Sequence, residues 1–118
     1  MAIVLKRAYE EPRTEDGYRV LVDRLWPRGV SKEEAQLDEW LKEAAPSDQL
    51  RKAFHGGELS WGAFRRRYLS ELKGRREALR PLAERARRER VTLVFSSQNQ
   101  EHNNAVVLKQ YLQMLGPG

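Results

Sequence analysis

Two groups of polar side chains that could bind or transform a ligand each come at the end of an apolar segment. Asp23, Arg24 and Arg28 end the segment that begins at Val20. The second group follows the apolar run of residues 91–95 and comprises Ser96, Ser97, Gln98, Asn99, His102 and Asn103. In an open α/β sheet, polar residues at the carboxyl ends of strands line the ligand crevice. The sequence therefore predicts one pocket built from both groups.

The first group and His102 offer anion binding and proton transfer. Arg24 and Arg28 carry planar forks that suit a phosphate or a carboxylate. Asp23 or His102 would be the acid or base if the site is catalytic. The alternatives are structural: Asp23 forms an ion pair with a neighbouring arginine, and His102 only orders the first turn of the closing helix. Trp26 either packs beside Pro27 or stacks on a ligand ring.

The second group would surround an anion with hydrogen-bond donors. Ser96 and Ser97 either cap the closing helix or bind the anion. The backbone N–H groups of residues 97–101 are expected at the positive end of that helix, where anions bind readily. Gln98, Asn99 and Asn103 can hold a ligand through their amides. His55 precedes two glycines and is interpreted as a loop residue.

Composition excludes several classes of function. The chain has 118 residues and no cysteine, which removes thiol catalysis, disulfides and cysteine-based zinc sites. Two histidines are too few for a histidine-rich metal site, so neither a metal nor a cofactor is predicted. No apolar run approaches the roughly 20 residues of a membrane span, and the first residues do not form a signal peptide. We expect a single domain, residues 1–118, in the cytoplasm and without membrane contact.

The net charge of +5 is unevenly distributed. Eleven basic and four acidic residues lie between Arg65 and Arg90, a net charge of +7 that leaves −2 for the rest of the chain. This basic face (residues 65–90) could attract nucleic acid. The interpretation we prefer is a solvated pair of helices whose arginines alternate with glutamates, giving weak and non-specific binding.

Helix and strand signals alternate along the chain. Residues 3–6, 18–25 and 91–95 read as strands, and residues 37–43 as either a helix or an edge strand. Ser31 to Glu34 forms a capping box, and Ser47 and Ser60 are further helix starts. Helices are predicted at residues 47–54, 61–73, 78–90 and 101–115. The expected fold is α/β: one small domain with a short, mostly parallel sheet of three to four strands and helices on both faces.

These residues also carry a family resemblance that extends over nearly the whole chain. The run Asp-Arg-Leu-Trp-Pro-Arg-Gly at residues 23–29 resembles the signature of the YeaO-like branch of the bacterial family called domain of unknown function 488. Further matches are Trp-Leu-Lys-Glu at residues 40–43, Ala-Pro-Ser at 45–47, Phe-Arg-Arg-Arg-Tyr-Leu at 64–69, Glu-His-Asn at 101–103 and Ala-Val-Val-Leu at 105–108. The family has no settled activity, so the resemblance does not imply a reaction.

The chain departs from the family pattern at the second group. Similar members usually carry a basic residue and an aspartate where this chain has Gln98 and Asn99, and a histidine in place of Asn104. The wider family often has a Cys-His-Arg element at residues 101–103, of which only His102 is present here. If the charged residues of the turn are catalytic in relatives, catalysis is in doubt for this chain.

The function predicted from the sequence is binding of an anionic small molecule, phosphorylated or nucleotide-like, at the carboxyl ends of the strands. If the protein is an enzyme, it would be a hydrolase or a transferase acting on a phosphate- or sugar-bearing substrate, with Asp23 or His102 as the acid or base. The alternative is a nucleic-acid-associated module that uses the basic face without catalysis. A third possibility is an interaction protein with a vestigial pocket. The oligomeric state is left open.

Overall fold

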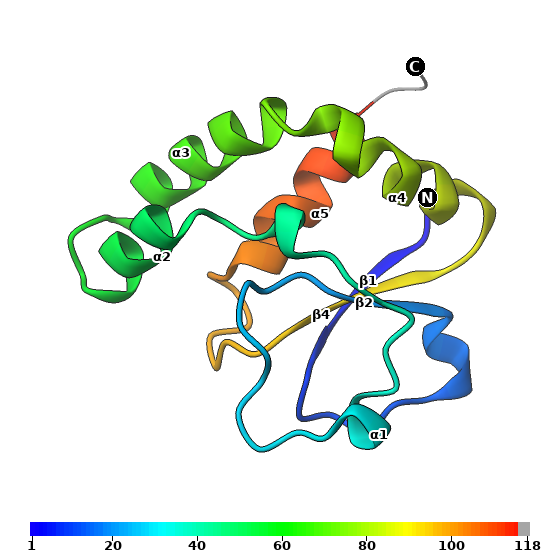
Figure 1. Cartoon of the computed structure of the whole chain (residues 1–118). Helices are drawn as coiled ribbons and strands as arrows, with labels where there is room; N and C mark the ends of the chain where they lie inside the picture. The colour runs from blue at the N-terminus through cyan, green and yellow to red at the C-terminus, as the bar shows by residue number, and fades with distance from the viewer. Residues whose placement is uncertain (116–118) are drawn as a thin grey trace.

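The computed structural model describes residues 1–115, so the last three residues of the predicted domain lie outside the described part. Its centre is a sheet of four parallel strands in the order β1-β4-β2-β3 (Figure 1). The strands are β1 (Ile3–Arg7), β2 (Tyr18–Leu21), β3 (Glu39–Trp40) and β4 (Val91–Phe95). β4 pairs with β1 along five residues and with β2 along four. The parallel sheet is confirmed, and the ambiguous segment 37–43 contains the edge strand β3.

Within residues 1–115, five α-helices pack around the sheet: α1 (Lys32–Ala35), α2 (Asp48–His55), α3 (Trp61–Lys73), α4 (Arg76–Arg88) and α5 (Asn104–Met114). Two single turns, η1 (Thr14–Asp16) and η2 (Lys42–Ala44), are 3-10 helices. Ser31, Ser47 and Ser60 cap α1, α2 and α3, and each side chain accepts a hydrogen bond from the N–H three residues later. These starts were predictable because the caps satisfy N–H groups that a helix leaves unpaired.

Several predicted boundaries differ from the structure, and three of them bear on the site or on the packing of the helices. β2 ends at Leu21 rather than residue 25. α4 begins at Arg76 rather than residue 78, because Ala78 N and Leu79 N already bond to Arg75 O, so Pro81 lies in the second turn. α5 begins at Asn104 rather than residue 101, because the Asn103 side chain accepts the Val106 N–H and sets the start of the helix.

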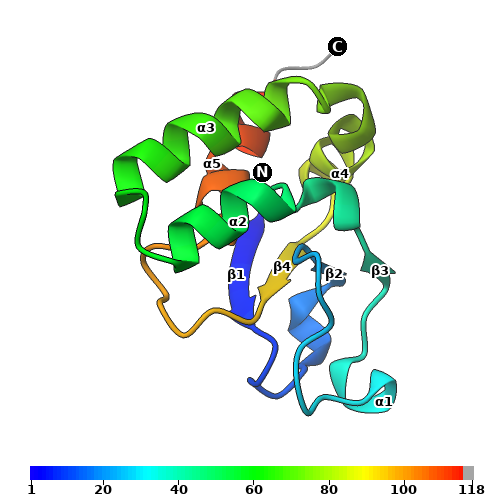
Figure 2. The same ribbon diagram turned by 60° about the vertical axis from the view of Figure 1, so that its left-hand side comes forward.

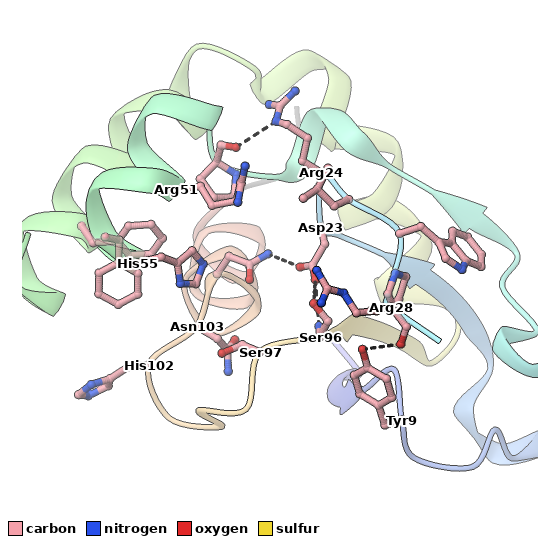
Figure 3. A pocket seen from close by; sticks show the side chains of 17 residues that line it. Tyr9, Asp23, Arg24, Arg28, Arg51, His55, Ser96, Ser97, His102 and Asn103 are labelled. Atoms are coloured by element: carbon pink, nitrogen blue, oxygen red, sulfur yellow. Dashed lines mark hydrogen bonds between the residues drawn. The ribbon is translucent and has the colours of Figure 1, made fainter. Parts of the chain in front are cut away.

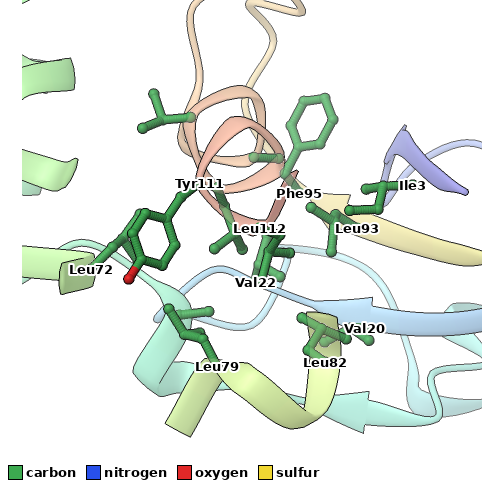
Figure 4. Packing of buried hydrophobic residues seen from close by; sticks show 14 of the residues in the cluster. Ile3, Val20, Val22, Leu72, Leu79, Leu82, Leu93, Phe95, Tyr111 and Leu112 are labelled. Carbon is green, nitrogen blue, oxygen red and sulfur yellow. The ribbon is translucent and has the colours of Figure 1, made fainter. Parts of the chain in front are cut away.

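The main hydrophobic core lies on one face of the sheet (Figure 4). Side chains alternate across a strand, so Val91, Leu93 and Phe95 of β4 face this core. Helices α2, α3, α4 and α5 lie together on that side of the sheet (Figure 2). Their buried residues that pack in this core are Leu50, Phe64, Tyr68, Leu72, Leu79, Leu82, Leu108, Tyr111 and Leu112. Burial of these side chains is the main stabilising term of the fold.

The opposite face is covered by shorter elements, η1, α1 and the loop after β2. Leu21 and Val94 pack there with Trp26, Leu37 and Trp40. Arg19, only 4% exposed, donates to the carbonyls of residues 35 and 36 in and after α1 and forms a salt bridge of 2.7 Å with Asp16 in η1. Within the described residues, no helix has the length and apolar character needed to cross a membrane.

Candidate functional site

A cavity of about 310 Å³ opens where β2 and β4 end (Figure 3). We call it the edge cavity. Its lining comes mainly from the loops after β2 and β4 and from α2, with single residues from the loop after β1, the segment before α2, α3 and the start of α5. The lining residues are Tyr9, Asp23, Arg24, Leu25, Trp26, Pro27, Arg28, Pro46, Arg51, Phe54, His55, Phe64, Ser96, Ser97, His102, Asn103 and Asn104. Asp23 and His102 therefore lie at the same edge of the sheet, as the parallel topology required.

Asp23 joins three elements of the fold instead of pairing with an arginine. Its Oδ2 accepts hydrogen bonds from Ser96 N (2.9 Å) and Ser96 Oγ (2.7 Å), and its Oδ1 accepts one from Asn104 Nδ2 (3.0 Å). Asn104 Nδ2 also donates to Val22 O. The Asp23 carboxylate thus ties the end of β2 to the end of β4 and the start of α5, and it forms no salt bridge within residues 1–115.

Two tryptophans hold the loop after β2 in place. Trp40 Nε1 donates to Asp23 O at 2.7 Å, and Trp26 Nε1 donates to Val30 O at 2.6 Å. The two indole rings meet edge to face, with their centroids 5.4 Å apart. Trp26 therefore packs within the protein and also lines the edge cavity. Trp40 of β3 helps to position Asp23 through the hydrogen bond to its backbone carbonyl.

Three arginines line the edge cavity. Arg24 Nε donates to Pro46 O and lies 3.7 Å from Asp48. The exposed Arg28 guanidinium makes no hydrogen bond or ion pair with the described residues, although its backbone carbonyl accepts from Tyr9. Arg51 Nη2 lies 3.3 Å from Asp48, while its Nε is buried and has no hydrogen-bond partner within residues 1–115. A buried donor without a partner is rare in proteins.

Sequence reasoning missed Arg51 and misread His55. His55 is the last residue of α2 rather than part of a loop, and it lines the edge cavity. Arg51, Phe54 and His55 stand at positions i, i+3 and i+4, so they share one face of the helix. That spacing was visible in the sequence, but only the packing shows that the face turns toward the strand ends.

α2 is fixed at its beginning, which orients this face. Ser47 N and Ser47 Oγ both donate to the Glu71 carboxylate of α3, at 2.9 and 2.6 Å. Tyr68, also on α3, donates from its hydroxyl to Ala44 O. Burial, and secondarily the charge of Asp23, raise the pKa of Tyr68, so its phenol stays protonated and keeps that bond.

Two of the five backbone N–H groups predicted to surround an anion, those of Asn99 and Glu101, are hydrogen-bonded within the loop itself. Asn99 Oδ1 accepts hydrogen bonds from Glu101 N (3.0 Å) and His102 N (2.9 Å), and Asn99 N donates to Ser97 Oγ. The side chains of Ser97 and Asn99 therefore accept hydrogen bonds from these N–H groups, as short polar residues often do in turns. Gln98 and Asn99 are exposed and lie outside the lining of the edge cavity.

His102 lies in the loop before α5, not in the first turn of the helix. Its ring stacks on Trp61, with the centroids 4.6 Å apart and the planes 10° apart. Figure 3 shows His102 well separated from Asp23, with Asn103 and Ser97 between them. Both candidate acid–base residues line the edge cavity, at different points of it.

The described residues contain no group of three or more histidine, cysteine, aspartate or glutamate side chains that could hold a metal ion. The edge cavity is lined by cationic and aromatic side chains. Its arginines are Arg24, Arg28 and Arg51, its one acidic residue is Asp23, and its rings include Phe54 and His55.

The fold and this edge cavity define a small parallel α/β protein with a ligand-sized site at the carboxyl ends of its strands. A family model described as the inactive DUF488-N3 subclade matches residues 2–115. The chain belongs to this branch of the DUF488 family. The YeaO-like resemblance seen in the sequence is thereby confirmed.

Two relatives show how far the similarity extends. The chain is 46% identical to "Uncharacterized protein YeaO" of Escherichia coli (strain K12), over 98% of this chain and 100% of that protein. It is 38% identical to "Uncharacterized protein Rv3073c" of Mycobacterium tuberculosis (strain ATCC 25618 / H37Rv), over 90% of this chain and 89% of that protein. No solved structure matches the chain.

Proposed function

We propose that this protein binds an anionic small molecule in the edge cavity and does not catalyse a reaction on it. The observation that carries the proposal is the charge of the lining, which has three arginines, Arg24, Arg28 and Arg51, and one carboxylate, Asp23. Asp48, outside the lining, is shared by Arg24 and Arg51 and leaves Arg28 unpaired within residues 1–115. Arginine forks suit phosphate and carboxylate groups. Arg28 is uncommitted to any described partner, so it can bind a ligand without first breaking an ion pair.

Binding is better supported than hydrolysis or transfer. A general base needs a free lone pair within reach of the substrate proton. Three hydrogen bonds from Ser96 and Asn104 hold the Asp23 carboxylate and leave open only one of its roughly four acceptor sites. The His102 ring is stacked on Trp61. The matching family model is described as inactive. The chain also lacks the charged and thiol residues that relatives were expected to carry between residues 98 and 104.

The basic face is less supported as a functional surface. Several of its arginines have partners inside the protein: Arg75 bonds to Glu43 O and Ala45 O, and Arg65 to Gln110. Arg85 pairs with Glu89 at 2.9 Å and lies over the Tyr18 ring. Fewer charges are therefore free for nucleic acid than the sequence alone suggests. The cytoplasmic location expected from the sequence stays a prediction.

The test is isothermal titration calorimetry with inorganic phosphate, pyrophosphate and ribose 5-phosphate. Arg28→Ala and Arg51→Ala should each weaken binding by about 10- to 100-fold, since hydrogen bonds to charged groups contribute about 1.5–3 kcal/mol. Arg67→Ala is the matched control, because Arg67 is exposed on α3 and does not line the edge cavity. Equal effects of the Arg28 and Arg67 variants, or no binding of any probe, would contradict the proposal.

A further inference from the structure

We propose that the ligand of the edge cavity is a nucleoside monophosphate, with its phosphate at Arg28 and Arg51 and its base against His55 and Phe54. This inference rests on the proposed function and goes beyond it by naming the chemical class of the ligand. Two different kinds of lining, one cationic and one aromatic, lie in the same cavity. A ligand that uses both must combine an anion with a planar ring.

α2 presents the two kinds of lining side by side. Arg51 lies one helical turn before Phe54 and His55, and side chains at this spacing are separated by about 5–6 Å at their Cβ atoms. A phosphate and a base are likewise held apart by the sugar that joins them. The face of α2 therefore offers contacts in the order that a nucleotide would use.

Arg51 supplies an independent sign that an anion belongs in the edge cavity. Its Nε is buried and has no hydrogen-bond partner within the described residues, and its nearest carboxylate, Asp48, is 59% exposed and 3.3 Å from Nη2. Leaving a buried donor unpaired is unfavourable, because the donor has lost its hydrogen bonds to water. A phosphate oxygen is a strong acceptor that would satisfy this donor.

The aromatic end is built from rings that are already packed. Phe54 stacks on Phe64, with the centroids 4.3 Å apart, and Trp61 lies 5.8 Å from Phe64. His55 lies at the margin of this group, 5.8 Å from Phe54, and is exposed. Its ring is held by the neighbouring aromatic side chain and remains accessible to a base. Stacking on such a ring is independent of the identity of the base.

The size of the edge cavity limits the ligand to one nucleotide. Its volume of about 310 Å³ is at the lower end of the range for small-molecule sites. A single-stranded nucleic acid would need a groove that continues past the first nucleotide. A sugar phosphate would leave the aromatic end unused, and a free nucleoside would leave the arginines without an anion.

The experiment is calorimetry with AMP, GMP, CMP and UMP, compared with ribose 5-phosphate and adenosine. The monophosphates should bind at least about tenfold more tightly than ribose 5-phosphate or adenosine. His55→Ala should weaken binding of the monophosphates roughly fivefold or more, the lower end of the range for base–aromatic stacking, and leave ribose 5-phosphate unchanged. His55 is exposed at the end of α2, so this variant should fold normally.

Gln49→Ala is the matched control, because Gln49 is exposed on α2 and does not line the edge cavity; it should alter neither affinity. If ribose 5-phosphate binds as tightly as the monophosphates, or if His55→Ala has the effect of Gln49→Ala, the nucleotide inference is wrong while the anion site stands. If no phosphate compound binds, the proposed function fails with it.

Discussion

Asp23→Asn tests whether Asp23 is a structural tie or a reactive group. In the native protein the carboxylate accepts three hydrogen bonds, two from Ser96 and one from Asn104. An asparagine can offer its oxygen to Ser96 or to Asn104, but not to both. Its NH₂ group must then face a donor. Asn104 cannot relieve the conflict by rotating its amide, because Nδ2 also donates to Val22 O.

The expected loss of stability follows from these contacts. One hydrogen bond is lost, and the two that remain change from charge-assisted to neutral. Each of these three changes lowers the contribution of the bond concerned to stability by about 1 kcal/mol. The site is only partly buried, so water can satisfy some of the displaced groups. We therefore expect Asp23→Asn to lower the free energy of unfolding by about 2–4 kcal/mol.

Urea denaturation followed by tryptophan fluorescence measures this change, and the slope with denaturant should not alter. Glu33→Gln is the matched control, since Glu33 is an exposed carboxylate of α1; it should change stability by less than about 0.5 kcal/mol. A stability loss as small as that of the control would refute the structural role. If Asp23→Asn showed such a small stability loss and also abolished ligand binding, Asp23 would instead be a residue that contacts the ligand.

Three further predictions concern the rest of the molecule. Asp16→Ala should cost about 3–5 kcal/mol, because it leaves the buried Arg19 charge unpaired. Burial raises the pKa of Asp16, but hydrogen bonds from Arg13 N, Lys6 and Arg19 more than offset this effect, so the pKa lies below its usual value. The stabilisation by Asp16 is therefore present above about pH 4, and it is lost as the pH falls through the pKa of the folded state. Unfolding free energies measured from neutral to acid pH should show this loss in the native protein and not in Asp16→Ala, and parallel curves would contradict it. Gly17→Ala should destabilise by more than about 2 kcal/mol in thermal unfolding, because φ is +67° and a Cβ would lie 2.3 Å from Arg90 O, whereas Gly29→Ala, with φ +80° and open space, should cost less. DNA or RNA should bind the basic face non-specifically, with a Kd on the order of 10⁻⁴–10⁻⁶ M at physiological salt and a steep salt dependence; submicromolar, sequence-selective binding in a filter-binding salt series would instead favour the nucleic-acid module.

Much of the local structure was predictable because its causes are local. The serine caps of α1, α2 and α3 act within three residues, so the starts of these helices follow from the sequence. The apolar run of β4 requires burial on both faces, which placed it inside a parallel sheet. The predicted start of α5 at residue 101 is wrong because the side chain that caps the helix is Asn103, not Ser96 or Ser97.

The shared location of the candidate site residues was predictable in outline, because parallel strands bring their carboxyl ends to one edge of the sheet. Asp23, Arg28, Ser96 and His102 were placed together on that ground, and all line the edge cavity. Their roles were not predictable. The partner of Asp23 is Ser96, 73 residues away in the sequence, rather than the arginine beside it. No pattern within the sequence reports a contact of that range.

The sequence by itself determined the elements of this protein and the edge at which its polar residues gather, because caps, periodicity and chain direction are local properties. Only the tertiary structure decided which of those residues face the edge cavity. It placed α2 over the strand ends, added Arg51 and His55 to the site, and turned Gln98 and Asn99 away from it. The physical reason is that the direction of a helix face depends on what it packs against, and the Ser47–Glu71 contact that orients α2 joins segments 24 residues apart.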